Sequence, residues 1–161
     1  MLRAHRLAVG FYNEDPETGK IVRTDQFELD VDGELTIVEA AAGKARPALI
    51  LVNDDDLTYT KLRFDEKSLK FAAENLYRFD DALARSVIWL AFWDMTRDGE
   101  LPAKQFIETS LAALATEHES TTFRYALAQV STTAWHYTAP ADRAEVVEHV
   151  AAELFKLAQS A

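Results

Sequence analysis

Two kinds of hydrophobic periodicity divide the chain. Before residue 53 the apolar positions form short alternating runs between turn residues, and four of the five glycines lie there. After Asp65 they recur every three or four residues almost to the end of the chain. Alternation is typical of half-buried strands, and the longer period is typical of amphipathic helices. The pattern predicts an α+β fold in sequence order. A small antiparallel β-sandwich-like part is expected over 1–65, followed over 66–161 by an α-helical bundle or α-solenoid of HEAT- or armadillo-like helix pairs.

About five strands are expected in the first part. Asp15-Pro16 and Thr18-Gly19 are turn signals, and Asp32-Gly33 suits a tight hairpin turn. Residues 40–46 read as a loop. The predicted strands are His5–Tyr12, Ile21–Val31, Glu34–Glu39, Ala48–Val52 and Leu57–Phe64. Five strands suffice for a small or incomplete sandwich.

The stretch 53–65, N-D-D-D-L-T-Y-T-K-L-R-F-D, is the expected joint between the two parts. Its three successive aspartates favour a turn, because short acidic side chains bond to nearby backbone and repel one another into water. Asp65 is placed to cap the first helix, with Glu66 in its first turn.

Five helices are expected after the joint. Asp80 or Asp81 caps the second, and Asp98-Gly99 ends it. Its middle, residues 87–93, is apolar on every side, which predicts a buried helix at the centre of the helical layer. Pro102, Ser120 and Pro140 begin the last three. The predicted inward faces are Leu69, Ala72, Ala73 and Leu76; then Phe106, Ile107, Leu111 and Leu114; then Phe123, Leu127 and Val130; then Val146, Val147, Val150, Leu154 and Leu157.

Charge and composition exclude several classes of protein. The net charge is −10 and the pI is near 4.8, which argues against binding to nucleic acid or to an anionic membrane. There is no cysteine, hence no disulfide and no thiolate chemistry. No apolar run approaches the ~20 residues of a membrane span, and no signal-peptide pattern follows Met1. We therefore expect a soluble, cytoplasmic protein.

Candidate metal ligands are scattered. A zinc peptidase helix needs H-E-x-x-H, whereas the only His-Glu pair, His118-Glu119, is followed by Thr122 in place of the second histidine. Glu145 and His149 are spaced as a metal pair but read as helix-surface residues. Asp54-Asp55-Asp56 lacks the alternate spacing and the glycine of a calcium loop, which favours a solvated turn.

The remaining candidates also read as structural. His5 and His136 stand beside apolar neighbours, as partly buried histidines do. Trp89, Phe92 and Trp93 have the spacing of a packed core rather than of an aromatic pocket. Surface carboxylates are abundant in so acidic a chain, so an enzyme built on them is the least favoured hypothesis. No catalytic, cofactor-binding or metal-binding residue is predicted.

Two strings carry a family resemblance: L-V-N-D-D-D-L-T-Y-T-K-L-R-F-D-E from Leu51, and W-x3-W-D-M-T-R-D-G-E-L-P-A from Trp89. They resemble bacterial aminopeptidase N, a zinc aminopeptidase family of the gluzincin type related to the puromycin-sensitive aminopeptidases. The resemblance covers the region where a β-sandwich domain leads into the beginning of the C-terminal helical domain. Asn53, Tyr59 and Lys61 match an Asn, an aromatic and a basic position of relatives. Many relatives carry Arg at position 61, and Lys lacks its bidentate geometry.

The resemblance implies a non-catalytic, C-terminal-region fragment of a zinc aminopeptidase that removes N-terminal residues from peptides. In that family the zinc ligands, the general-base Glu and the transition-state Tyr belong to segments absent from this sequence, so none is carried over. The zinc would belong to the parent enzyme, and this chain should be inactive alone. Its implied role is to enclose the active site and gate peptide substrates, with the missing catalytic domain of the same polypeptide as its partner. The alternative is a free-standing helical protein-interaction module.

Two further expectations concern the helices. Trp93 and Trp135 are 42 residues apart, each with Thr three residues on and Pro-Ala beyond, as in HEAT or armadillo pairs. Any two helices that precede a Pro-capped helix would show the same residues. The repeated spacing therefore leaves open whether the helices form such pairs or only share this local pattern. If Ala161 is an artificial stop in a stack, the apolar face of the last helix lacks a neighbour, which predicts self-association through the C-terminal helices, with Glu148 and Glu153 at the rim.

Overall fold

The computed structural model of the chain describes residues 4–160. Internal contacts divide it into two compact units, one reaching to Ile88 and the other starting at Trp89. We call them the sheet unit and the helical unit. The expected division into 1–65 and 66–161 follows secondary structure instead, and it stays a prediction. The first helix does begin where expected, at Glu66 after Asp65.

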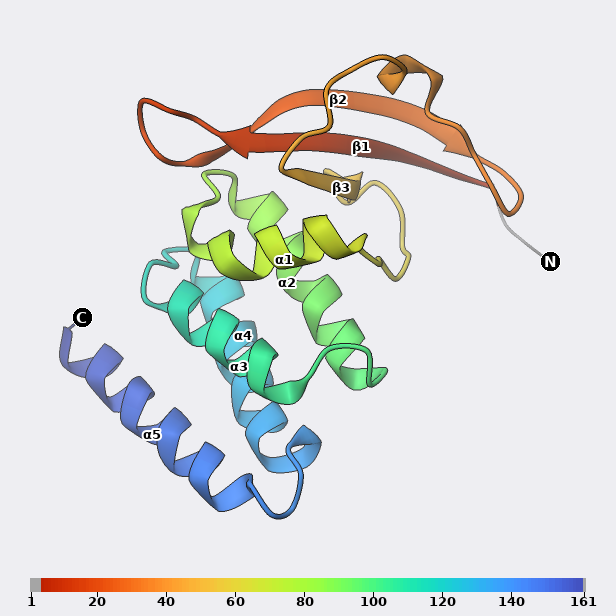
Figure 1. The fold of residues 1–161 in the computed structure, drawn as a ribbon. Helices are drawn as coiled ribbons and strands as arrows, with labels where there is room; N and C mark the ends of the chain where they lie inside the picture. Colours follow the sequence, from red (N-terminus) through yellow and green to blue (C-terminus); the bar gives the residue numbers. More distant parts are fainter. Residues whose placement is uncertain (1–3, 161) are drawn as a thin grey trace. The chain divides into compact units, whose positions relative to one another are not determined.

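The sheet unit contains a three-stranded antiparallel sheet in the order β2-β1-β3, with β1 in the middle (Figure 1). Its strands are β1 (His5–Glu14), β2 (Ile21–Val31) and β3 (Leu49–Asp54). The turn between β1 and β2 closes through Asp15, whose carboxylate accepts from the Glu17 amide at 3.0 Å. Three of the five predicted strands are confirmed.

Two predicted strands are wrong. Residues 34–38 are irregular and lead into a 3-10 turn, Glu39–Ala41. The alternating Leu35 and Ile37 are 83% and 69% exposed, because the segment turns so that Val38 and Ala41 pack on the sheet instead. The segment 57–64 contains no strand either. The described residues therefore form one sheet with three strands, not a sandwich of five.

The pleat of β1 gives the sheet two different faces. Leu7, Val9 and Phe11 form an apolar cluster on one face, where Phe11 meets Phe27 edge to face at 5.1 Å. Alternate residues of a strand point to opposite faces. Ala8, Gly10 and Tyr12 therefore lie on the other face, which we call the polar-cluster face.

Two helices begin in the sheet unit, and both are capped as predicted. Helix α1 (Glu66–Asn75) is capped by Asp65, whose side chain accepts from the amides of Lys67 and Ser68. The Ser68 hydroxyl accepts from the Ile50 amide at 3.1 Å, which ties α1 to β3. After a 3-10 turn (Leu76–Arg78), the Asp81 carboxylate accepts from two amides at the start of α2 (Ala82–Arg97).

The helical unit contains the rest of α2 and three further helices, so the five predicted helices are confirmed (Figure 1). They are α3 (Ala103–Leu114), α4 (Ser120–Thr132) and α5 (Arg143–Ser160), with a π-helical turn, Thr133–Tyr137, after α4. Gly99, at φ +76°, follows the end of α2, and Pro102 is the N-cap of α3. Glu119, not Ser120, caps α4: its longer carboxylate reaches the Thr121 amide at 3.1 Å. Within residues 4–160 no helix combines the length and apolar character that crossing a membrane requires.

Aromatic residues form much of the core of the helical unit. Trp89 and Phe92 are buried, as predicted, and the Trp89 indole donates to the Ser110 hydroxyl at 3.0 Å. Trp93 packs against Phe106 and Tyr137, with ring centroids at 5.8 and 5.7 Å. Leu90 is 52% exposed, so the expectation that residues 87–93 are buried on every side is wrong there. The HEAT- or armadillo-like arrangement stays a prediction.

The predicted apolar face of α5 is less exposed than expected. Val150 is only 5% exposed, whereas Val146, Val147, Leu154 and Leu157 are half-buried. Phe155, which the periodicity did not assign to this face, is 64% exposed. Self-association through the C-terminal helices remains a prediction.

Candidate functional site

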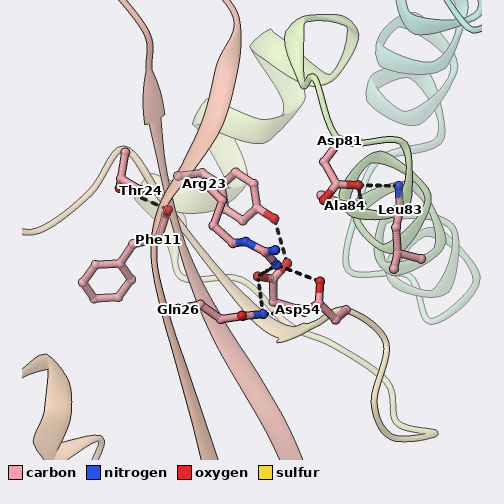
Figure 2. Close-up of polar contacts among 10 residues, drawn as sticks. Phe11, Arg23, Thr24, Gln26, Asp54, Asp81, Leu83 and Ala84 are labelled. Atoms are coloured by element: carbon pink, nitrogen blue, oxygen red, sulfur yellow. Dashed lines mark hydrogen bonds and ion pairs between the residues drawn. The ribbon is translucent and has the colours of Figure 1, made fainter.

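Five polar residues meet on the polar-cluster face of the sheet, and we call them the junction cluster: Tyr12, Arg23, Gln26, Asp54 and Asp55. The buried Asp54 carboxylate accepts from the Tyr12 hydroxyl at 2.7 Å and from Arg23 Nη1 at 2.8 Å. The same Arg23 nitrogen lies 2.7 Å from Asp55, and Gln26 donates to both carboxylates (Figure 2). A single network therefore joins all three strands at the end of β3.

A bulge in β2 places two of these donors together. Tyr12 pairs with Arg23 and Gly10 pairs with Gln26, so the three residues 10–12 of β1 face the four residues 23–26 of β2. In a regular strand, residues three apart point to opposite faces. The extra residue, Thr24, brings Arg23 and Gln26 onto one face. The Thr24 hydroxyl itself bonds to the Phe11 carbonyl at 3.2 Å (Figure 2).

A second bulge, at Asn53, places the acceptor. Val52 pairs with Val9 and Asp54 pairs with Ala8, leaving Asn53 unpaired at φ +57°. Without the bulge Val52 and Asp54 would share a face, which would place a carboxylate in the apolar cluster. Asparagine tolerates this left-handed conformation better than most residues. Both bulges thus serve the same purpose: they bring Asp54 and its donors to one side of the sheet.

Proton positions in the cluster follow from burial and hydrogen bonding. Burial, followed by the hydrogen bond to Asp54, raises the pKa of Tyr12 far above its ordinary value, so its hydroxyl stays protonated as a donor. Hydrogen bonds to Asp54 and Asp55 raise the pKa of Arg23. Hydrogen bonds from Gln26 and Arg23 lower the pKa of Asp55. The cluster is therefore a neutral phenol and a cation that hold two carboxylates.

The space around Asp54 is filled. A Cβ placed on Gly10 would lie 2.3 Å from Asp54 Oδ2 and 2.8 Å from a Tyr12 ring carbon. Asp54 is 1% exposed and Tyr12 is fully buried. No other residue type would fit at position 10 without displacing the carboxylate. Such a packed, internally bonded carboxylate suits a structural clamp rather than general acid–base catalysis, which needs access to a substrate.

The clamp continues into the loop after β3. The Asn53 side chain accepts from the Thr58 amide at 3.0 Å and donates to the Thr58 carbonyl at 2.8 Å. The Thr58 hydroxyl is 2.8 Å from His5 Nδ1 on β1, so His5 is a half-buried, hydrogen-bonded histidine, as predicted. Asp55 and Asp56 have φ angles of +65° and +52°. We call residues 53–58 the pinned loop.

The three aspartates differ from the solvated turn that was expected. Asp54 is buried, because Tyr12 and Arg23 replace the water it would otherwise need. Asp55 bonds Arg23 and Gln26, and Asp56 accepts from the Asn53 amide group at 3.2 Å. The expectation that repulsion among the aspartates drives their side chains into water is thus wrong for Asp54. Among residues 4–160 no group of three His, Cys, Asp or Glu side chains is placed to hold a metal ion.

The other sequence candidates do not come together. His118 is exposed, and His136 is exposed too, which contradicts the expected burial. His149 Nε2 lies 3.1 Å from Glu108 Oε1 of α3, and Glu145 lines the same groove between α3 and α5. That no residue of this chain binds a metal or cofactor or takes part in catalysis stays a prediction.

Sequence reasoning missed Tyr12, Arg23 and Gln26. Their strands were predicted, but strand order and bulges decide which side chains meet. One signal was available: Asn53, a residue that tolerates positive φ, stands directly between a predicted strand and an acidic triplet. An acidic triplet with a bulge-prone residue before it is a reason to look for a cation on a neighbouring strand.

Comparisons with known proteins agree with the resemblance seen in the two strings. Residues 49–160 match the ERAP1-like C-terminal domain family. The chain is 45% identical over 142 residues to the aminopeptidase N of Streptomyces lividans, an alignment that covers 88% of this chain and 16% of that relative. The chain thus spans about one sixth of its relative's length. The predicted resemblance to bacterial aminopeptidase N is confirmed, and the chain belongs to the ERAP1-like C-terminal domain family.

Proposed function

We propose that this chain is a non-catalytic region of a zinc aminopeptidase that removes N-terminal residues from peptides. The observation that carries the proposal is the 45% identity to an aminopeptidase N, together with a family match over residues 49–160, which include the joint at 53–65. The sequence contains no H-E-x-x-H, and the described residues gather no zinc-type ligand set. The zinc would therefore be held by other parts of the polypeptide and would there activate water for peptide hydrolysis.

Within such an enzyme the chain would help to enclose the active site and limit which peptides enter. The support is architectural. The junction cluster fixes the end of β3, and Asp65 and Ser68 fix the start of α1 against that same strand. These bonds fix the geometry within the sheet unit, and a region that shapes a substrate chamber needs such fixed geometry because small errors in position reduce catalysis sharply. The partner would be the catalytic domain of the same polypeptide, acting in the cytoplasm.

The test compares the 161-residue chain with the longer polypeptide that contains it. We expect the longer polypeptide to bind one zinc ion by metal analysis and to release nitroaniline from aminoacyl-nitroanilides in a chelator-sensitive way. The 161-residue chain should do neither. Stoichiometric zinc in the short chain, or chelator-sensitive turnover by it, would contradict the proposal.

A further inference from the structure

Two large side chains in and directly after the pinned loop are exposed: Leu57 about half and Tyr59 fully. Tyr59 is 103% exposed relative to an extended reference, and Leu57 is 49% exposed. Both lie in the segment that was predicted as a strand but makes no strand pairing. The Tyr59 ring therefore has its apolar surface available for contact with a partner, and an aromatic ring buries one of the largest areas of any side chain.

The backbone beneath these side chains is held in place. Asn53 bonds both the amide and the carbonyl of Thr58, the residue between Leu57 and Tyr59. The Thr58 hydroxyl is in turn bonded to His5. Asp55 and Asp56 keep left-handed φ angles, a conformation that persists only where the surroundings enforce it. Strain and multiple bonds in a loop that presents exposed apolar side chains are typical of a recognition element.

The size of this element decides between possible partners. Two side chains of this kind bury a few hundred Å² at most. Separate proteins need roughly 1,200–2,000 Å² of total buried surface for a specific, stable complex. A contact as small as this one suffices only when its partner is tethered, because a linker supplies a high effective concentration. The partner that fits is therefore another domain of the same polypeptide.

From this geometry we infer that Leu57 and Tyr59 dock into the catalytic domain of the same polypeptide, with Tyr59 as the anchor. The inference rests on the proposed function for the identity of that domain. The receiving surface would be an apolar recess with a hydrogen-bond acceptor for the Tyr59 hydroxyl, since a buried phenol needs a partner. The pinned loop presents the anchor already ordered, so docking costs little conformational entropy.

The experiment measures the contact without relying on activity. Amide hydrogen exchange over residues 57–60 is compared between the 161-residue chain and the longer polypeptide. We expect exchange to be at least about tenfold slower in the longer polypeptide. Tyr59→Ala should remove that protection and lower the thermal midpoint of the longer polypeptide, while leaving the midpoint of the 161-residue chain unchanged. Tyr59→Phe, which keeps the ring, should retain the protection.

The matched control is Thr60→Ala, which changes the adjacent exposed residue without removing a large apolar side chain. It should leave both exchange and midpoint unchanged in both proteins. Equal exchange in the two proteins would overturn the inference, and so would protection that appears in the 161-residue chain alone as its concentration rises, which would identify a second copy as the partner. If the proposed function itself is wrong, the result is different: the longer polypeptide would lack zinc and aminopeptidase activity, whatever the amide exchange shows.

Discussion

The two units of the molecule bury their polar groups differently. The sheet unit carries a fully buried tyrosine and a carboxylate that is 1% exposed, joined to a cation and bonded across three strands. The helical unit packs through aromatic and aliphatic contacts, and its buried polar residues are mostly hydroxyl-bearing, such as Ser110, which accepts from the Trp89 indole. A buried charged network is satisfied in only one arrangement of its side chains, because each member is costly to leave without a partner. Apolar packing, in contrast, adjusts to small changes in side-chain shape. The sheet unit should therefore be the more easily broken by single polar substitutions.

The largest effect is expected for Asp54→Ala. The substitution leaves the buried Tyr12 hydroxyl without its acceptor and removes one of the two carboxylates that hold Arg23. Leaving the buried Tyr12 hydroxyl unsatisfied costs about 1–3 kcal/mol of unfolding free energy, and the lost Arg23 bond and side-chain packing add to it. Amide exchange in β1 should become faster by a corresponding factor. All three tryptophans lie in the helical unit, so tryptophan fluorescence follows that unit separately. Unchanged exchange in β1 would refute the clamp.

A smaller effect is expected for Ser110→Ala in the helical unit. The Trp89 indole N–H loses its acceptor, while the apolar contacts of both residues remain. An unsatisfied buried donor costs about 1–3 kcal/mol, and the value here should fall at the lower end because a hydroxyl is small and the surrounding packing can adjust. Urea unfolding followed by tryptophan fluorescence measures it. A loss as large as that of Asp54→Ala would remove the contrast between the units.

The smallest expected effect is a loss of stability of the sheet unit at low pH. Hydrogen bonds from Gln26 and Arg23 lower the folded-state pKa of Asp55 below its unfolded value of about 3.9. A depressed carboxyl pKa stabilises the fold above the unfolded pKa, and that contribution is lost as pH falls through the folded pKa. The sheet unit should therefore weaken as pH falls below about 4. Asp55→Asn should make this dependence shallower when urea midpoints at pH 6 and pH 3.5 are compared. The control, Glu153→Gln on α5, should leave exchange in β1 unaffected.

Much of the fold follows from the sequence, but the candidate site does not. Helical periodicity and caps such as Asp65 and Asp81 act within one or two turns, so they can be recognised locally. The three paired strands were equally visible. Residues 57–64 have a strand-like composition, but Asn53 folds the chain back onto Thr58, and no neighbouring strand pairs with the segment. Local preference decides a strand only when a partner strand is available.

The junction cluster depends on information that single-strand patterns lack. Arg23 and Asp54 are 31 residues apart, and their meeting requires both strands to pair with β1 in particular registers. The two bulges then change which face of the sheet Arg23 and Asp54 occupy, relative to the face that simple alternation predicts. The alternating pattern alone would have assigned Asp54 to the face of Val52. Long-range pairing, rather than residue type, is therefore what the sequence analysis could not supply.

The bulge at Thr24 bears on how this cluster would be recognised in other chains. Here the two donors read R-x-x-Q, with Thr24 as the residue that the ladder does not need. A chain one residue shorter, with a regular second strand, would present the same two side chains on the same face as R-x-Q. Inserting or deleting one residue at this point thus leaves both donor side chains on the same face of the sheet, although it changes the spacing of the sequence motif. A search for the cluster has to be written in terms of facing positions on neighbouring strands, not as a string of fixed spacing.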